Sequence, residues 1–236
     1  NNSFIFNSVP KLDGLRSNLW QHFQGIEIET TKDVFNAEII NLMDFNCEQR
    51  NQVHFFYTLP FRKNRALIET TWLSNFKERS FMDYDQQLES YIKINLGIKN
   101  YNLKFKEEGA IPLFYPAKIK EGLVINIGSA GGMTRLSTGY TFLNIQEHSK
   151  YITNNIDIIK KVKKFNIGKK YEFLDKVFLR VLKNNPEKMP EIFFKMFNNS
   201  PNTIVKFLSN KSNLFEDLSV IFKMPKWIFI KALLKS

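Results

Sequence analysis

A glycine-rich stretch between an apolar segment and a long helical pattern is the strongest candidate for chemistry in this sequence. It runs from Gly128 to Phe142 and reads Gly-Ser-Ala-Gly-Gly-Met-Thr-Arg-Leu-Ser-Thr-Gly-Tyr-Thr-Phe. Glycines let backbone approach a ligand closely, and Ser137 or Thr138 could cap a helix that we expect to begin there. Free N–H groups at a helix start favour an anion such as a phosphate. The stretch predicts either a nucleotide site or a tight strand-to-helix connection without a ligand.

Two carboxylates lie in segments with strand patterns, where they could transfer protons. Glu69 follows the apolar residues 66–68, and Asp44 belongs to the candidate strand 39–45. A desolvated carboxyl group has a raised pKa and is a suitable proton donor. The alternatives are an outward-facing Glu69 that pairs with Arg65 or Arg62, and an Asp44 that stabilises a turn. The residues alone leave these alternatives open.

Cysteine and histidine do not indicate a metal site. Cys47 is the single cysteine among 236 residues, and the three histidines lie far apart in the sequence. An internal disulfide is excluded, which fits a reducing, cytoplasmic setting. No apolar run approaches the roughly 20 residues of a transmembrane helix.

The net charge of +11 is concentrated in the C-terminal part of the chain. Residues 160–236 contain 17 Lys or Arg and 6 Asp or Glu, so the first 159 residues are neutral. The basic residues alternate with apolar groups at helical spacing, for example along 173–182 and 193–197. This pattern is typical of amphipathic helices with a solvated basic face, or of a surface that contacts an anionic membrane. Nucleic acid is a further possible partner for the charge.

The elements that must position these residues are strands in the first half and helices in the second. Alternating or apolar runs predict strands at 1–10, 19–29, 39–45, 53–60, 66–72, 101–106 and 123–127. Apolar spacing predicts a helix over 83–96, closed by Gly97. We expect Pro60 to end its strand and residues 109–113 to form a short break. From Thr138 onward, helical segments follow one another, separated by Gly168 and four prolines.

Five short stretches, in a fixed order along the chain, carry a resemblance to a known family. They are Trp-Gln-His-Phe-Gln-Gly (20–25), Leu-Met-Asp-Phe (42–45), Tyr-Thr-Leu-Pro (57–60), Leu-Ile-Glu-Thr-Thr (67–71) and the glycine stretch. Together they resemble the flavin-dependent lycopene cyclases of carotenoid biosynthesis, and the helical tail resembles that of bacterial lycopene β-cyclases. The resemblance covers essentially the whole chain. One departure is Leu136, where the family usually has a proline that fixes φ.

The resemblance implies an α+β fold class, with an incomplete α/β FAD-binding flavoprotein fold. A mixed β-sheet substrate domain would be followed by a mainly α-helical C-terminal region. The expected divisions are a remnant of the FAD-binding domain (1–18), the β-rich substrate domain (19–118), the C-terminal part of the FAD-binding domain (119–160) and a basic helical tail (161–236). The family's Gly-x-Gly-x-x-Gly unit would precede residue 1. We therefore expect an N-terminally truncated chain that is inactive alone.

The resemblance also implies the reaction and its residues. Each ψ-end of lycopene, or of a related linear carotene, would close to a β-ionone ring without net redox change. Glu69 would be the general acid/base and Asp44 a second carboxylate. Phe55, Tyr57 and Trp72 would line the substrate tunnel. Reduced FAD, with NAD(P)H as its electron source, would be held by Gly128, Ala130, Gly131, Gly132, Met133, Ser137, Thr138, Gly139 and Tyr140.

Further expectations concern partners and competing functions. A cytoplasmic protein on a membrane surface fits the tail, with no nucleic acid and no stated oligomeric state. The alternatives are another FAD-dependent enzyme of isoprenoids, either a monooxygenase or a geranylgeranyl reductase, and a non-enzymatic basic module at the membrane.

Overall fold

The chain divides into two compact units in a computed structural model. The model describes residues 3–10, 18–75, 83–115, 120–121, 123–158 and 168–234. One unit, here the sheet unit, is Gly14–Ala110, and the other, the helical unit, joins Asn1–Asp13 to Ile111–Ser236. The fold class is α+β, as the sequence predicts.

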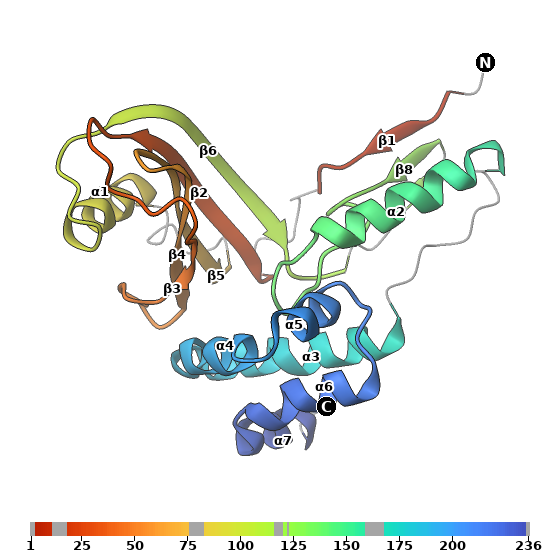
Figure 1. The fold of residues 1–236 in the computed structure, drawn as a ribbon. Coiled ribbons are helices and arrows are strands. Elements are labelled where there is room, and N and C mark those ends of the chain that lie inside the picture. Colours follow the sequence, from red (N-terminus) through yellow and green to blue (C-terminus); the bar gives the residue numbers. More distant parts are fainter. Residues whose placement is uncertain are drawn as a thin grey trace. The chain divides into compact units, whose positions relative to one another are not determined.

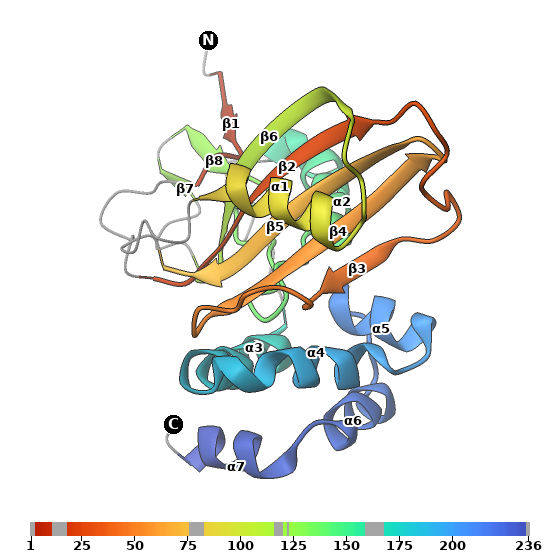
Figure 2. The same cartoon turned by 90° about the vertical axis from the view of Figure 1, so that its left-hand side faces the viewer.

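A five-stranded sheet with the order β3-β4-β5-β2-β6 forms the sheet unit (Figure 2). Its strands are β2 (Trp20–Glu29), β3 (Asn41–Asp44), β4 (Val53–Arg62), β5 (Arg65–Ser74) and β6 (Asn102–Pro112). Strands β4 and β5 form the predicted antiparallel hairpin, and β5 pairs antiparallel with β2 along ten residues. These long central strands fix which side chains share a face, because successive side chains point to opposite faces.

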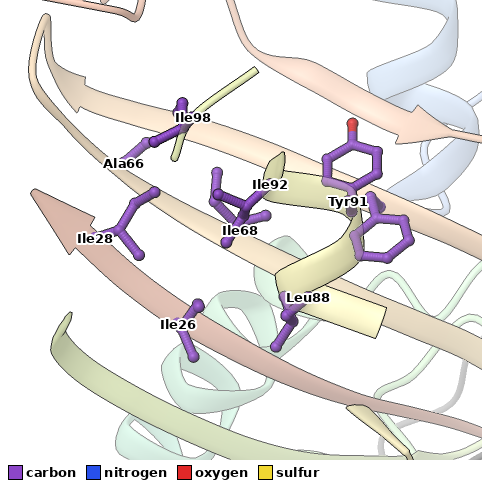
Figure 3. Packing of buried hydrophobic residues seen from close by; sticks show 9 residues of the cluster. Ile26, Ile28, Ala66, Ile68, Leu88, Tyr91, Ile92 and Ile98 are labelled. Carbon is purple, nitrogen blue, oxygen red and sulfur yellow. The ribbon is translucent and has the colours of Figure 1, made fainter. Parts of the chain in front are cut away.

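Helix α1 (Tyr84–Ile94) lies across one face of this sheet (Figure 2). Its apolar side chains point toward those of the central strands (Figure 3). The core cluster consists of Ile26, Ile28, Phe56, Ala66, Ile68, Leu88, Tyr91, Ile92 and Ile98. The helix ends close to Gly97, whose φ of 68° suits glycine. The predicted helix and its stop are confirmed.

Two expected interruptions of the sheet are wrong. Pro60 does not end β4, which continues to Arg62 with Pro60 opposite Ala66. Pairing of β3 with β4 reaches only Thr58, so β4 has an open edge at Pro60, where a missing N–H is tolerated. Residues 109–112 continue β6. Gly109 fits within the strand because the Phe23 ring fills the space beside it.

The helical unit combines a three-stranded sheet with helices (Figure 1). Strand β1 pairs parallel with β8, and β7 pairs antiparallel with β8. The elements are β1 (Ile5–Asn7), β7 (Lys120–Glu121), β8 (Val124–Asn126), α2 (Phe142–Asn154), α3 (Lys169–Asn184), α4 (Met189–Phe197), α5 (Pro201–Leu208), α6 (Leu214–Lys223) and α7 (Lys226–Leu234), with 3₁₀ turns at 156–158 and 186–188. In the described part of the chain, no helix is both long enough and apolar enough to cross a bilayer.

The predicted punctuation of the helices is confirmed. Gly168 is the N-cap residue of α3, and Pro190 and Pro201 lie in the first turns of α4 and α5. Proline is tolerated there because first-turn N–H groups have no partner within the helix. The expected domain boundaries at residues 118 and 160 lie outside the described residues. The contacts place residues 111–236 in one unit, so the helical tail and the glycine stretch belong together.

Candidate functional site

Glu69 lies at the centre of β5, on the face of the sheet opposite α1. It pairs with Gly25 on β2 and with Tyr57 on β4. The Thr71 hydroxyl donates a hydrogen bond of 2.6 Å to Oε1 of Glu69. Burial raises the pKa of Glu69 to about 7, a hydrogen bond from Thr71 opposes this, and the charge of Glu107 adds to it. Near neutral pH this carboxyl group can therefore hold a proton and donate it.

The arginines that could have neutralised Glu69 are engaged elsewhere or do not reach it. Arg65 forms an ion pair with Glu27, on the neighbouring strand. Among the described residues, neither Arg62 nor Arg65 forms an ion pair with Glu69. An unpaired carboxyl in a half-buried position favours the protonated form, because desolvation penalises the charge.

The three aromatic residues expected around the substrate are divided between the two faces. Phe55 and Tyr57 share the face of Glu69, with ring centroids 5.2 Å apart in an edge-to-face arrangement. Trp72 lies on the α1 face, where it stacks on His54 with centroids 3.9 Å apart and donates a hydrogen bond to Gln87. The sheet brings Phe55 and Tyr57 to Glu69 and separates Trp72 from it.

Asp44 also lies on the α1 side of the sheet. It pairs with Phe56, whose ring stacks on Tyr91. The Tyr91 hydroxyl donates a hydrogen bond of 2.6 Å to Asp44, and the backbone N–H of Asn46 donates another of 2.9 Å. These contacts support the turn-stabilising alternative, because they tie the end of β3 to α1.

Two buried histidines form polar contacts beneath α1. His22 contacts the hydroxyl groups of Tyr84 and Ser74 at 2.6 Å each. His54 contacts the Glu48 carbonyl at 2.7 Å and the Thr70 hydroxyl at 2.8 Å. Burial lowers the pKa of both to about 4. Both imidazoles are therefore neutral at pH 7, and their contacts tie α1 to the sheet.

The glycine stretch forms two consecutive turns between β8 and α2. Gly128, Gly132 and Gly139 have φ values of 56°, 78° and 71°. A Cβ atom on Gly131 would lie 2.6 Å from the backbone oxygen of Asn126, so only glycine fits there. The first turn contains Gly128 to Met133, and the second contains Ser137 to Tyr140. All nine residues expected at the cofactor thus lie on one continuous segment.

The expected helix start at Ser137 or Thr138 is wrong. Helix α2 begins at Phe142, and its N-cap residue is Thr141. Thr138 and Gly139 instead donate backbone hydrogen bonds to the Arg135 carbonyl, which closes a separate turn. The Thr141 hydroxyl donates to the Gly139 carbonyl and does not cap the helix. The first turn of α2 has no acidic residue, so its N–H groups remain suited to an anion.

Comparison with known proteins identifies the family. A family model described as "Lycopene cyclase protein" matches residues 2–234. The chain belongs to the lycopene cyclase family.

Individual relatives of this lycopene cyclase family member are distant and longer. It is 28% identical over 148 residues to a chloroplastic/chromoplastic lycopene beta cyclase of Capsicum annuum, covering 58% of this chain and 30% of that protein. It is 25% identical over 139 residues to a chloroplastic neoxanthin synthase of Solanum tuberosum, covering 54% and 28%. The chain thus matches less than a third of the length of these relatives. The flavin-dependent brominase Bmp2 has a similar fold, with a TM-score of 0.51, 8% identity, and coverage of 99% of this chain and 62% of that one.

Sequence reasoning missed the buried ion pair that holds the glycine stretch of this family member. Arg135 and Asp175 are 1% and 0% exposed, with Nη2 and Oδ1 2.9 Å apart. Asp175 also accepts a hydrogen bond of 3.0 Å from the Leu136 backbone N–H, and Arg135 donates to the Phe207 carbonyl. The Arg135 guanidinium lies 4.9 Å from the Tyr171 ring centroid. The sequence signal was an aspartate on the buried stripe of α3, among Tyr171, Phe178 and Leu182.

Two hydroxyl groups of the same stretch are buried without a partner. Among the described residues, neither Thr134 Oγ1 nor Ser137 Oγ has a hydrogen-bond partner. Ser137 lines a cavity of about 160 Å³ with side chains of α3, α6 and α7. Buried polar atoms without partners are uncommon, so these hydroxyls are candidates for contact with a ligand.

Proposed function

We propose that this chain is the substrate-binding sheet and the C-terminal half of the cofactor site of a lycopene β-cyclase. The observation that carries the proposal is the half-buried Glu69, with its pKa raised to about 7, on a sheet face with Phe55 and Tyr57. Family membership supports a linear carotene as substrate. The β-ring product and the intramolecular-lyase (isomerase) class are the finer part of the proposal.

Glu69 acts as the acid that starts ring closure. Its O–H proton adds to the terminal double bond of a ψ-end, and the neighbouring double bond attacks the resulting carbocation to form the ring. The ring cation then loses a proton to the Glu69 carboxylate, which restores the acid and completes a reaction without net redox change. Protonating an alkene needs a carboxyl group that is neutral at working pH and shielded from water. The aromatic rings of Phe55 and Tyr57 provide an apolar wall and can face a cation.

The glycine stretch fits an FAD site. The uncapped first turn of α2 suits a phosphate, and the buried hydroxyls of Thr134 and Ser137 could hydrogen bond to the flavin or its ribityl chain. The backbone of Gly128–Met133 and Ser137–Tyr140 would form the rest of this wall. When bound in reduced form, with NAD(P)H as electron source, FAD would supply negative charge near the carbocation.

A membrane surface is the proposed partner of α6 and α7. Phe215, Phe222, Trp227 and Leu234 are 81%, 63%, 76% and 81% exposed. Lysines at positions 223, 226 and 231 lie on the same helices. Exposed aromatic and aliphatic groups beside lysines suit the interface of an anionic bilayer.

Flotation with vesicles tests the membrane contact. The chain should float with vesicles that contain phosphatidylglycerol, and Phe222→Ser combined with Trp227→Ser should abolish this. Phe61→Ser, which removes a phenylalanine 57% exposed on the sheet unit, should not. Equal flotation of all three proteins, or no flotation of the unchanged chain, would contradict the proposal.

A second candidate substrate is another carotenoid end group, because the chain is also similar to a neoxanthin synthase. Expression of the full-length protein in a lycopene-accumulating host distinguishes the candidates, with pigments separated by chromatography. The proposal predicts β-carotene from the full-length protein and none from the 236-residue chain alone. Glu69→Gln should leave lycopene unchanged, whereas Glu108→Gln, at an exposed position, should not. Unchanged lycopene in the presence of flavin-loaded full-length protein would overturn the proposal.

A further inference from the structure

A second carboxylate, Glu107, lies beside Gly25 on the same face of the sheet as Glu69, at a place that sequence motifs did not indicate. A Cβ atom built on Gly25 would lie 3.2 Å from both Cγ and Oε1 of Glu107, on β6. Two residues along, a Cβ atom on Gly109 would lie 2.6 Å from the ring of Phe23. These matched contacts place Glu107 next to Gly25, and Gly109 next to Phe23, on the neighbouring strands β6 and β2.

The pairing of the strands extends this contact into a row. Gly25 pairs with Glu69, and Glu69 pairs with Tyr57. The row therefore crosses four strands in the order Glu107, Gly25, Glu69, Tyr57, all on the face opposite α1. The backbones of the two glutamates are separated by one intervening strand, which corresponds to about 9.5 Å. Because residue 25 is a glycine, it places no side chain of its own between the two carboxyl groups, and the nearest neighbours of its missing Cβ position are Glu107 and Leu67, each at 3.2 Å.

Among the described residues, the charged groups of this face form no ion pair with either carboxyl group. Strands β2 and β5 contribute Glu27 and Arg65, which form an ion pair with each other. Strand β4 contributes the Tyr57 hydroxyl. Among the described residues, Glu107 has neither a hydrogen bond nor an ion pair, and Glu69 has only the hydrogen bond from Thr71. Two neighbouring carboxylates without a cation do not ionise together readily, because each charge disfavours the other.

We propose that Glu107 and Glu69 form a carboxyl pair over Gly25, in which Glu107 carries the negative charge and Glu69 carries the proton. This inference rests on the proposed function in using Glu69 as the acid. Glu107 is then a positioning residue that keeps the acid protonated. Consistent with this, the charge of Glu107 adds to burial in raising the pKa of Glu69.

The glycine between them has a role that follows from the same contacts. A methyl group at residue 25 would press on the Glu107 side chain and on Leu67 Cδ1, each at 3.2 Å. The Gly25→Ala chain should therefore fold with a displaced Glu107 carboxyl and a weaker coupling to Glu69.

Titration of the 236-residue chain tests the pair without any cofactor. Glutamate side chains are labelled with ¹³C at the carboxyl carbon, and the Glu69 signal is assigned by its loss in Glu69→Gln. In Glu107→Gln the titration midpoint of Glu69 should fall by about 0.5 pH unit or more, as expected when a like charge is removed. Glu108→Gln, the matched control on the opposite face of the same strand, should leave the midpoint in place. Equal midpoints in the Glu107→Gln and Glu108→Gln chains would overturn the inference.

A second variant, Glu107→Asp, tests the inference if Glu107→Gln does not fold. Glu107→Asp withdraws the charge by one methylene group, so it should lower the Glu69 midpoint by a smaller amount. An unchanged midpoint in a folded Glu107→Asp chain would also overturn the pair.

Activity of the full-length enzyme separates this inference from the proposed function. Cyclisation should be lost as pH rises through the pKa of Glu69, and Glu107→Gln should move this limb to lower pH. If Glu69→Gln cyclises lycopene at the unchanged rate, the proposed function fails. If Glu69→Gln is inactive while Glu107→Gln leaves both the titration and the pH limb in place, the function stands and the pair fails.

Discussion

Replacing Glu69 with glutamine should stabilise the folded chain at alkaline pH and not at acid pH. Burial raises the pKa of Glu69 from 4.5 to about 7 in the folded state. A raised carboxyl pKa gives stability that is fully present below pH 4.5 and is lost as pH rises through 7. The difference of about 2.5 units corresponds to about 3 kcal/mol at ~1.36 kcal/mol per unit. Glutamine carries no charge and can still accept the hydrogen bond from Thr71.

Urea unfolding of the 236-residue chain measures this effect. The free energy of unfolding of Glu69→Gln, minus that of the unchanged chain, should grow by about 2–3 kcal/mol between pH 4.5 and pH 8.5. Subtraction at each pH cancels the titration of the histidines. Glu108→Gln, at an exposed position, should show a difference within about 0.5 kcal/mol throughout. A difference for Glu69→Gln that does not change with pH would refute the raised pKa and with it the argument for a neutral acid.

Three further predictions concern the framework around the site. Asp175→Ala leaves the charge of Arg135 buried and unpaired, so the free energy of unfolding in urea should fall by about 3–5 kcal/mol. A double Asp175→Leu, Arg135→Met chain, which removes both charges, should recover stability. A loss below about 1 kcal/mol in Asp175→Ala would contradict this reasoning. The pKa values of His22 and His54 are about 4 against 6.5 unfolded, so the stability that these two histidines contribute should be complete above pH 6.5 and fall toward pH 4. The free energy of unfolding of the unchanged chain minus that of His54→Gln should therefore shrink between pH 6.5 and pH 4, and a difference that does not change with pH would contradict the burial of His54. Gly131→Ala should lower the melting temperature more than Ala substitution at Gly168, where the nearest atom to a Cβ is 3.9 Å away, and equal shifts would contradict the tight turn.

The strands and the strongest helices could be predicted because their patterns have a fixed period. Alternation located β2 to within a few residues, apolar runs located β3 and β5, and apolar spacing located α1 and α3. Interruptions were less predictable, because a residue that breaks a strand in isolation is tolerated when its neighbours accommodate it. Pro60 lies at an open edge, and the Phe23 ring covers Gly109. Neither compensation is visible in the local sequence.

The start of α2 could not be read locally for a different reason. Ser137 and Thr138 have the side chains of N-cap residues, and glycines precede them. The backbone at this point is held instead by Asp175, which lies about 40 residues further along and binds both Arg135 and the Leu136 N–H. A long-range buried ion pair thus overrides a local capping preference.

The grouping of the expected site residues could partly have been read from residue numbers. Side chains an even number of residues apart on one strand share a face, so Phe55 and Tyr57 belong together. Glu69 and Trp72 are an odd number apart, so one strand cannot present both to a single substrate. The pairing of β2, β4 and β5 shows which side chains of different strands share a face, and the core cluster shows which face α1 covers.

The two faces of this sheet differ in the surroundings of their titratable groups, and this difference supports the proposed role of Glu69. On the α1 face, both imidazole nitrogens of His22 and of His54 have partners, and Asp44 accepts several hydrogen bonds. These contacts specify the packing of α1 against the sheet. On the other face, Glu69 bears a desolvation cost at neutral pH that no cation among the described residues relieves. Folding alone would favour glutamine or a hydrophobic residue there, so a carboxyl group at residue 69 is consistent with the acid role proposed for it.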